Sequence, residues 1–165
     1  MNEKLLVLII NDMVIFPNNE VRIEYDNNYD KSIIEIFDQI EDNLMLIVNP
    51  IEEGNINVTS FPNVGVLGRL KLKMNVPNGK TRIVIEGIER VELHSLVEDN
   101  NFFKANYTDI EIFEGEEAEN YYSIILKSLD NYIAKVPYMG NAIMSQLNNV
   151  DTLSDLCDLV VSFLP

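Results

Sequence analysis

The sequence predicts an α+β protein in which a β-rich body of about 110 residues precedes about 50 residues of helices. In the first part, apolar residues alternate with polar ones or form short runs that Pro, Gly and Asn bound, which is typical of strands. In the second part, apolar residues recur every three or four positions, which is typical of amphipathic helices. We therefore expect a β-rich subdomain at residues 1–113 and a helical subdomain at 114–165.

A β-hairpin lies at the centre of the β-rich part. Leu70, Leu72 and Met74 alternate with lysines up to the segment 77–79, which reads Pro-Asn-Gly, and a second strand pattern resumes at Ile83. Proline suits position i+1 of a type I turn, and the glycine is free to adopt positive φ, so we expect a three-residue loop. The alternation predicts the Leu/Met set on one face and the Lys set on the other.

Further strand patterns surround the hairpin. Isoleucine and phenylalanine recur at i, i+3, i+4 and i+7 over residues 33–40, which predicts one short helix that the preceding Asn and Asp residues cap. Gly87 interrupts the second hairpin strand and indicates a bulge or a close backbone approach. The other expected strands are 5–10, 13–16, 21–25 and 44–48. Residues 91–97 continue the β pattern after the hairpin, and 102–112 supply a last strand or pair of strands.

The helical part begins with an acidic run at 114–119, which we interpret as a solvated first helical turn. One long helix is expected up to Pro137, a second at 141–147, and a third that Asp151 or Thr152 caps. The apolar stripe of the long helix is Ala118, Tyr122, Ile125, Leu129, Tyr132 and Val136, and that of the last is Leu153, Leu156, Val160 and Leu164.

Composition excludes several classes of partner. The formal charge of −15 argues against nucleic acid and against an anionic membrane surface. The run 5–10 is too short for a signal peptide or a membrane span, so we interpret it as a buried strand. Cys157 has no second cysteine, and with the lone His94 it offers no metal-ligand cluster, so we expect a reducing cytoplasmic setting.

The sequence contains no complete catalytic or phosphate-binding motif. The tripeptide 79–81, Gly-Lys-Thr, imitates the end of a phosphate-binding loop, but Met74 stands where that loop needs its first glycine. Cys157 and His94 belong to different predicted elements, and we expect Cys157 to be a buried apolar residue. We therefore expect no catalytic, cofactor-binding or metal-binding residue. Five cations gather on the hairpin, where a solvated face balanced by acids is favoured over a docking patch: Arg69, Lys71, Lys73, Lys80 and Arg82.

Several ordered motifs carry a resemblance to a known family. Residues 12–17, DMVIFP, resemble the opening signature of the amino-terminal domain of Lon proteases, and Val-Gly at 64–65, Phe-Lys-Ala at 103–105 and the closing helix at 153–165 resemble its later motifs. The hairpin is similar to the family's most specific motif. Ile9, Ile10 and Asn11 depart from the usual Pro-Leu-Arg, and the loop at 52–61 looks shortened. The signature residues, which we interpret as mainly structural, are Asp12, Phe16, Pro17, Gly65, Pro77, Gly79, Glu86, Gly87 and Arg90.

This resemblance implies a PUA-like twisted β pseudo-barrel with one short helix, followed by a small helical subdomain. It also implies a role in capturing unfolded or tagged protein substrates and in self-association within a Lon hexamer. In that family a following AAA+ module uses ATP and Mg²⁺, and a Ser-Lys dyad cuts the peptide. Neither motif occurs in these residues, so no cofactor is expected in this chain.

Two hypotheses of function follow. The favoured one is the substrate-recognition and assembly domain of an ATP-dependent serine protease that degrades misfolded and regulatory proteins. The alternative is a freestanding LON-domain adaptor or scaffold. RNA binding, suggested by other PUA-like folds, is disfavoured by the charge. For each candidate substrate contact the core interpretation is favoured over the binding one; these candidates are Met13, Ile15, Phe16, Tyr121, Tyr122 and Tyr132.

Overall fold

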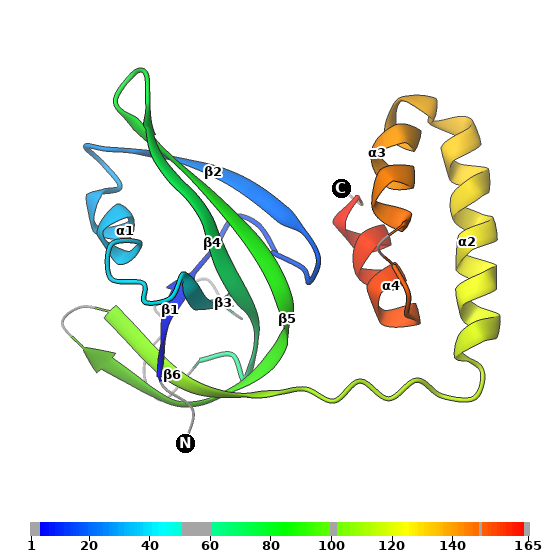
Figure 1. The fold of residues 1–165 in the computed structure, drawn as a ribbon, viewed down its shortest axis with the longest axis horizontal. Helices are drawn as coiled ribbons and strands as arrows, with labels where there is room; N and C mark the ends of the chain where they lie inside the picture. The colour runs from blue at the N-terminus through cyan, green and yellow to red at the C-terminus, as the bar shows by residue number, and fades with distance from the viewer. Residues whose placement is uncertain (1–3, 51–60, 100–101, 149, 164–165) are drawn as a thin grey trace. The chain divides into compact units, whose positions relative to one another are not determined.

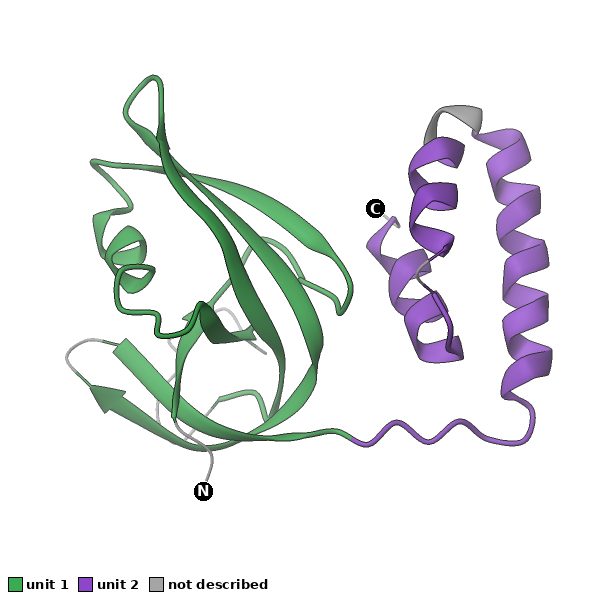
Figure 2. Ribbon diagram, in the orientation of Figure 1, with its two compact units in different colours: residues 1–110 green, residues 111–165 purple. Residues whose placement is uncertain are grey.

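The computed structural model describes residues 4–50, 61–99, 102–148 and 150–163. The chain divides into two compact units, residues 1–110 and 111–165 (Figure 2). The first carries the strands and one short helix, and the second carries helices alone, so the predicted α+β class is confirmed. The contact boundary follows Ile110, whereas the sequence placed it after Phe113. The predicted shortened loop at 52–61 lies outside the described residues except for Phe61, as do Leu164 and Pro165.

Six strands of the described residues form one sheet in the order β2-β5-β4-β3-β1-β6, and β5 also pairs with β6 (Figure 1). The extra pairing closes β5, β4, β3, β1 and β6 into a ring, with β2 added on the outside of β5. Only β1 and β3 pair in parallel among these. This closure is the expected pseudo-barrel. The strands are β1 (Leu5–Ile9), β2 (Glu20–Asp26), β3 (Leu44–Val48), β4 (Val64–Val76), β5 (Lys80–Asp99) and β6 (Phe102–Asp109).

Strands β1 and β3 are buried on both faces, which explains why they read as continuous apolar runs. Val7 and Leu46 belong to one core cluster, together with Val91 and Ala105 of β5 and β6. The neighbouring Leu8 belongs to a second cluster, in which α1 (Lys31–Ile36) and the residues after it take part. The second cluster also contains Ile10, Ile15, Phe37, Met45, Ile47, Ile83 and Ile85. The predicted helix at 33–40 is therefore present but ends at Ile36.

The β4–β5 hairpin has the predicted length of loop but not the predicted turn. Val76 pairs with Lys80, which leaves a loop of three residues. Asn78 and Gly79 have φ of 71° and 70°. A type I turn requires φ near −90° at its third position, so the type I prediction is wrong at Asn78. Asparagine and glycine both tolerate the left-handed region, so Asn78 and Gly79 can adopt it in succession.

A β-bulge overturns the predicted faces of the hairpin. Leu70 pairs with Ile85 but Leu72 pairs with Val84, so Lys71 is an extra residue in β4. One extra residue inverts every later side chain. Leu72 and Met74 are consequently 42% and 43% exposed, and the prediction that they share a face with Leu70 is wrong.

Lys73 takes the place on the inner face that the sequence assigned to its neighbours. Its Nζ donates to the carbonyl oxygen of Ile34 at 3.1 Å and pairs with the carboxylate of Asp38. A cation at the end of a short helix satisfies a carbonyl that has no partner within that helix. The bulge therefore brings a lysine to α1.

The second unit contains α2 (Ala118–Lys135), α3 (Pro137–Leu147) and α4 (Leu153–Ser162). The long helix is confirmed, but α3 begins four residues before the predicted Asn141, because Pro137 ends α2 and also suits the first turn of the next helix. Thr152 caps α4, and its Oγ1 accepts from the Asp155 amide at 3.1 Å. Cys157 is exposed, so the prediction that it is buried is wrong.

Candidate functional site

The family signature at residues 12–17 is an irregular segment, so the strand expected at 13–16 is wrong. The side chain of Asn49 holds its first half, because Nδ2 donates to the carbonyls of Ile10 at 2.8 Å and Met13 at 2.6 Å. The second half is anchored by Ile15, which is 1% exposed in the core cluster beside α1. Apolar burial and a side-chain amide thus replace the pairing of a strand.

Gly87 lets this segment lie directly against β5. A Cβ at Gly87 would stand 2.2 Å from the Phe16 carbonyl oxygen. Two hydrogen bonds of 2.9 Å join the segment to it: the Asn18 amide donates to the Gly87 carbonyl, and the Gly87 amide donates to the Asn19 carbonyl. The register also shifts here, since Leu67 pairs with Glu89 but Gly68 pairs with Gly87. Both expectations for Gly87, a bulge and a close approach, are confirmed.

Two other signature positions have a clear structural environment. A Cβ at Gly65 would lie 2.6 Å from the Ile47 carbonyl oxygen, so β4 approaches β3 too closely for a side chain. Glu86 pairs with Arg69 at 3.7 Å and with Lys71 at 3.3 Å. Of the remaining positions, Asp12 is exposed and Phe16, Pro17 and Arg90 are half-buried.

Four of the five hairpin cations have a carboxylate partner: Arg69, Lys71, Lys73 and Arg82. The Arg82 guanidinium donates twice to Glu24, at 3.0 and 2.7 Å, and this hydrogen bond holds the pKa of Glu24 below its usual value. Together with the pairs of Glu86 and Lys73, this arrangement is the balanced, solvated face that the sequence favoured. Exposed pairs of this kind contribute little to stability or binding.

The candidate substrate contacts fall into two groups. Ile15 is a core residue, Phe16 is half-buried, and Met13 is exposed at the edge of the first unit. In the helical unit, Tyr121 and Tyr132 are exposed, whereas Tyr122 is half-buried and its hydroxyl donates to the Val150 carbonyl at 3.0 Å.

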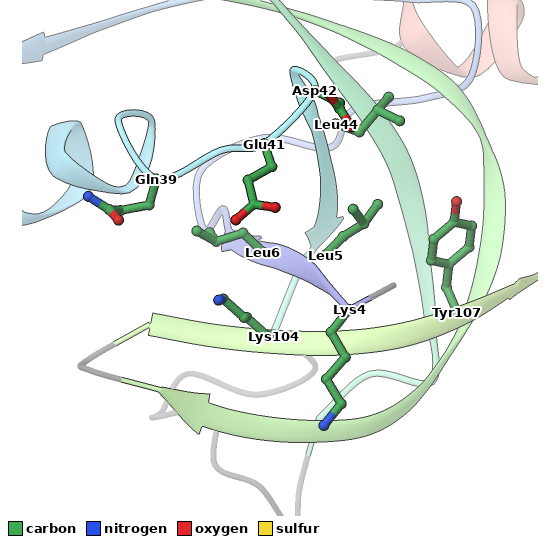
Figure 3. Close-up of a pocket in the computed structure, with 9 residues that line it drawn as sticks. All are labelled: Lys4, Leu5, Leu6, Gln39, Glu41, Asp42, Leu44, Lys104 and Tyr107. Carbon is green, nitrogen blue, oxygen red and sulfur yellow. The ribbon is translucent and has the colours of Figure 1, made fainter. Parts of the chain in front are cut away.

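The first unit has a polar pocket of about 280 Å³ (Figure 3). The lining side chains come from β1, β3, β6 and the segment after α1. No Ser, Thr, Cys or His is among them, and the ammonium of Lys104 already pairs with Asp99 at 3.3 Å. This pocket therefore lacks a Ser–His or Cys–His pair. Its lining consists of Lys4, Leu5, Leu6, Gln39, Glu41, Asp42, Leu44, Lys104 and Tyr107.

The helical unit has an apolar groove of about 330 Å³ between α2, α3 and α4. The hydroxyl of Ser128, its polar lining group besides Tyr132, donates to the carbonyl of Ile124 at 2.9 Å. The groove thus offers apolar surface and shape. Its lining residues, which we call the apolar groove, are Ile125, Ser128, Leu129, Tyr132, Ile143, Val160 and Phe163.

Sequence reasoning identified Tyr132 as a candidate contact but missed Ile143 and Phe163 in the groove. Ile143 lay in a helix whose start was misplaced, and Phe163 lies outside the predicted stripe of the last helix. The helical periodicity is the sequence signal for the groove. When an apolar stripe is too wide for the neighbouring helices to cover, part of its apolar surface stays exposed.

The described part of the chain has neither a metal-binding cluster nor a membrane-spanning helix. No group of three or more His, Cys, Asp or Glu side chains there could hold a metal ion. None of its helices has the length and apolar character needed to cross a membrane.

Comparison with known proteins gives the family. Residues 4–165 match a family model described as the ATP-dependent protease La (LON) substrate-binding domain. The chain is 23% identical over 170 residues to the Lon protease of Bacillus thuringiensis, covering 99% of this chain and 21% of that protein. It is 23% identical over 164 residues to the Lon protease of Haemophilus influenzae, covering 96% and 20%. The chain thus spans about a fifth of the length of these curated relatives.

Solved structures agree in fold. The N-terminal domain of Mycobacterium avium complex Lon protease superposes with a TM-score of 0.75 at 19% identity, covering 99% of this chain and 85% of that one. A Lon N-terminal domain protein from Xanthomonas campestris gives a TM-score of 0.58 at 12% identity, covering 99% and 100%. With a family model that spans nearly the whole chain, these likenesses show that the chain belongs to the LON substrate-binding domain family.

Proposed function

We propose that this chain is the substrate-recognition and assembly domain of an ATP-dependent Lon serine protease, and that it performs no catalysis itself. The match over residues 4–165 to a substrate-binding domain is the observation that carries the proposal. In the whole protein, a hexamer that degrades misfolded and regulatory proteins in the cytoplasm, ATP and Mg²⁺ would act in a separate AAA+ module.

The apolar groove is the surface we assign to substrate capture. Burying one large apolar side chain contributes about 1.5–3 kcal/mol, which alone is less than the roughly 4 kcal/mol of a millimolar complex. Each groove would therefore hold an exposed apolar side chain of an unfolded protein weakly. A hexamer would supply the missing affinity, because linked sites raise avidity about 10²–10⁴-fold.

Binding of this chain to a permanently unfolded protein tests the proposal. We expect saturable binding to fluorescently labelled, reduced and carboxymethylated α-lactalbumin, and much weaker binding to the native form, by fluorescence anisotropy. Tyr132→Ala should weaken binding, because it removes an exposed aromatic from the groove. Tyr29→Ala is the matched control, since Tyr29 is 88% exposed in the first unit and does not line the groove. Absence of saturation at high protein concentration would refute direct recognition.

Whether the natural protein carries the protease modules is a separate question that the coding sequence answers. Codons after Pro165 that specify a G-x-x-x-x-G-K-[ST] motif would support the protease. A stop codon there would support a freestanding adaptor instead.

A further inference from the structure

The helical unit is charged at one end. The amide of Leu153 donates to Glu114 Oε1 at 2.6 Å, and the Tyr122 hydroxyl donates to the Val150 carbonyl, so the N-terminal ends of α2 and α4 lie together. These ends carry six of the unit's nine acidic residues, against two lysines in the whole unit. We call this region the acidic end; its residues are Glu114, Glu116, Glu117, Glu119, Asp151 and Asp155.

The apolar groove lies farther along the same two helices. Its first α2 residue, Ile125, follows Ala118 by seven positions, which is about 10 Å along a helix axis. On α4, Val160 and Phe163 line it, at the end opposite to the Thr152 cap. An extended peptide covers about 10 Å in three residues, since it rises roughly 3.3 Å per residue. A polypeptide with a side chain in the groove therefore reaches the acidic end within a few residues.

The opposite end has a different charge. Lys135 lies in the last turn of α2, one turn beyond the groove residue Tyr132. The next helix, α3, contains no charged residue. Of the unit's other acidic residues, Asp130 lies beside Tyr132 on α2, and Asp158 is buried in α4. Most of the unit's negative charge thus lies on one side of the apolar anchor of a bound chain. The Ser128 hydroxyl already donates to the Ile124 carbonyl. We therefore expect selectivity beyond apolar shape to come from nearby charges rather than from a hydrogen bond of Ser128.

We propose that the apolar groove selects unfolded segments in which Lys or Arg residues lie three to five positions to one side of a large apolar residue. This inference rests on the proposed function and specifies its substrate class. The basic residues of the bound segment and the acidic end attract each other across solvent, where the screening length is ~8 Å at physiological salt. The preference for basic residues is therefore moderate and depends on salt. Acidic residues on that same side are disfavoured for the same reason.

Three labelled peptides test this selection. They share a Leu-Phe-Leu core and carry two Lys, two Ser or two Glu residues four positions from the central Phe. Because each exposed charge contributes little, we expect the Lys peptide to bind about three- to tenfold more tightly than the Ser peptide in 50 mM NaCl, and the Glu peptide to bind more weakly still. At 500 mM NaCl the three affinities should converge. Each series is made with the charges before and after the core, since either chain direction can present them.

Variants of the chain locate the effect. The triple variant Glu116→Gln, Glu117→Gln and Glu119→Gln should sharply reduce the Lys-over-Ser preference, because it removes three of the six charges of the acidic end and all three side chains are exposed. An equal change of charge in the first unit is the control and should preserve it; it combines Glu89→Gln, Glu92→Gln and Glu98→Gln, which are exposed on β5. Tyr132→Ala should weaken all three peptides.

The outcomes separate the inference from the function on which it rests. Equal affinity for the Lys and Glu peptides at low salt, with unfolded protein still bound, would overturn charge selection and leave substrate recognition standing. Binding of the Lys peptide that Tyr132→Ala leaves unchanged would also overturn it, because charge alone would then bind the peptide. Failure to bind unfolded protein as well would refute the proposed function.

Discussion

Alanine at Gly87 should disturb the contact between the signature segment and the sheet. The added Cβ would stand 2.2 Å from the Phe16 carbonyl oxygen and 3.0 Å from its carbon, and both atoms belong to backbone. No rotamer change can relieve such a contact. Either the segment shifts as a whole or it detaches from β5.

The structure bounds the cost of these two responses. Detachment would lose the two hydrogen bonds of Asn18 and Asn19 to Gly87, at about 0.5–1.5 kcal/mol each, and the burial of Ile15, at about 1.5–3 kcal/mol. A concerted shift that keeps these contacts resembles an overpacked core and costs about 1–3 kcal/mol. The molecule takes the cheaper response, so we expect Gly87→Ala to lower the free energy of unfolding by about 1–3 kcal/mol.

Amide hydrogen exchange read by NMR is the assay, because it resolves the first unit from the helical one. Exchange of the Asn18 and Gly87 amides should accelerate about fivefold or more, because both amides donate across the contact that the substitution weakens. Gly115→Ala is the matched control: a Cβ there would meet no atom within 4 Å, so stability should change by less than about 0.5 kcal/mol. Unchanged protection of Asn18, with stability equal to wild type, would refute the assigned role of Gly87.

Three other predictions concern separate parts of the fold. Gly79→Val should cost about 1 kcal/mol or more through backbone strain alone, because Gly79 has φ of 70° and open space around it; an unchanged melting temperature would contradict this account. Thr152→Ala should cost about 1 kcal/mol by removing the cap of α4, which faster exchange of the Asp155 amide would report and unaltered exchange would disprove. Burial, followed by the charges of Asp30 and Asp12, raises the pKa of Tyr25. Above a pH of about 10 the folded state therefore retains a proton that the unfolded state loses, and the free energy of unfolding falls as pH rises. Tyr25→Phe should flatten this alkaline decline in urea-unfolding experiments from pH 9 to 11; an equal slope in both proteins would exclude the tyrosine as its source.

Local signals in the sequence were sufficient wherever short-range chemistry decided the structure. The buried strand at 44–48 has the bounds that its apolar run predicted, and the hairpin loop has the length that Pro-Asn-Gly predicted. Thr152 was one of two predicted caps because its hydroxyl needs only the amide three residues ahead. In the loop and the cap the partner groups lie within a few residues of one another, and the strand is marked by its own apolar run.

The misplaced features depend on partners far away in the sequence. Residues 13–16 have the composition of a strand, but Asn49 and Gly87 hold them in an irregular path. Lys71 is a bulge in the pairing of β4 with β5, and Lys73 beyond it reaches α1, but nothing in the alternation around Lys71 shows this. The faces of Leu72 and Met74 then followed from the bulge.

The sequence by itself determined the class of the protein, the succession of a β-rich and a helical part, and the family, because periodicity, turn residues and the spacing of signature motifs are properties of the linear chain. Only the tertiary structure decided which apolar residues remain open to a partner. Ile15, a candidate contact, is buried in the core, while Ile143 and Phe163 line the groove that α2, α3 and α4 leave between them. The physical reason is that burial depends on which elements pack together, and that packing joins residues that are distant along the chain.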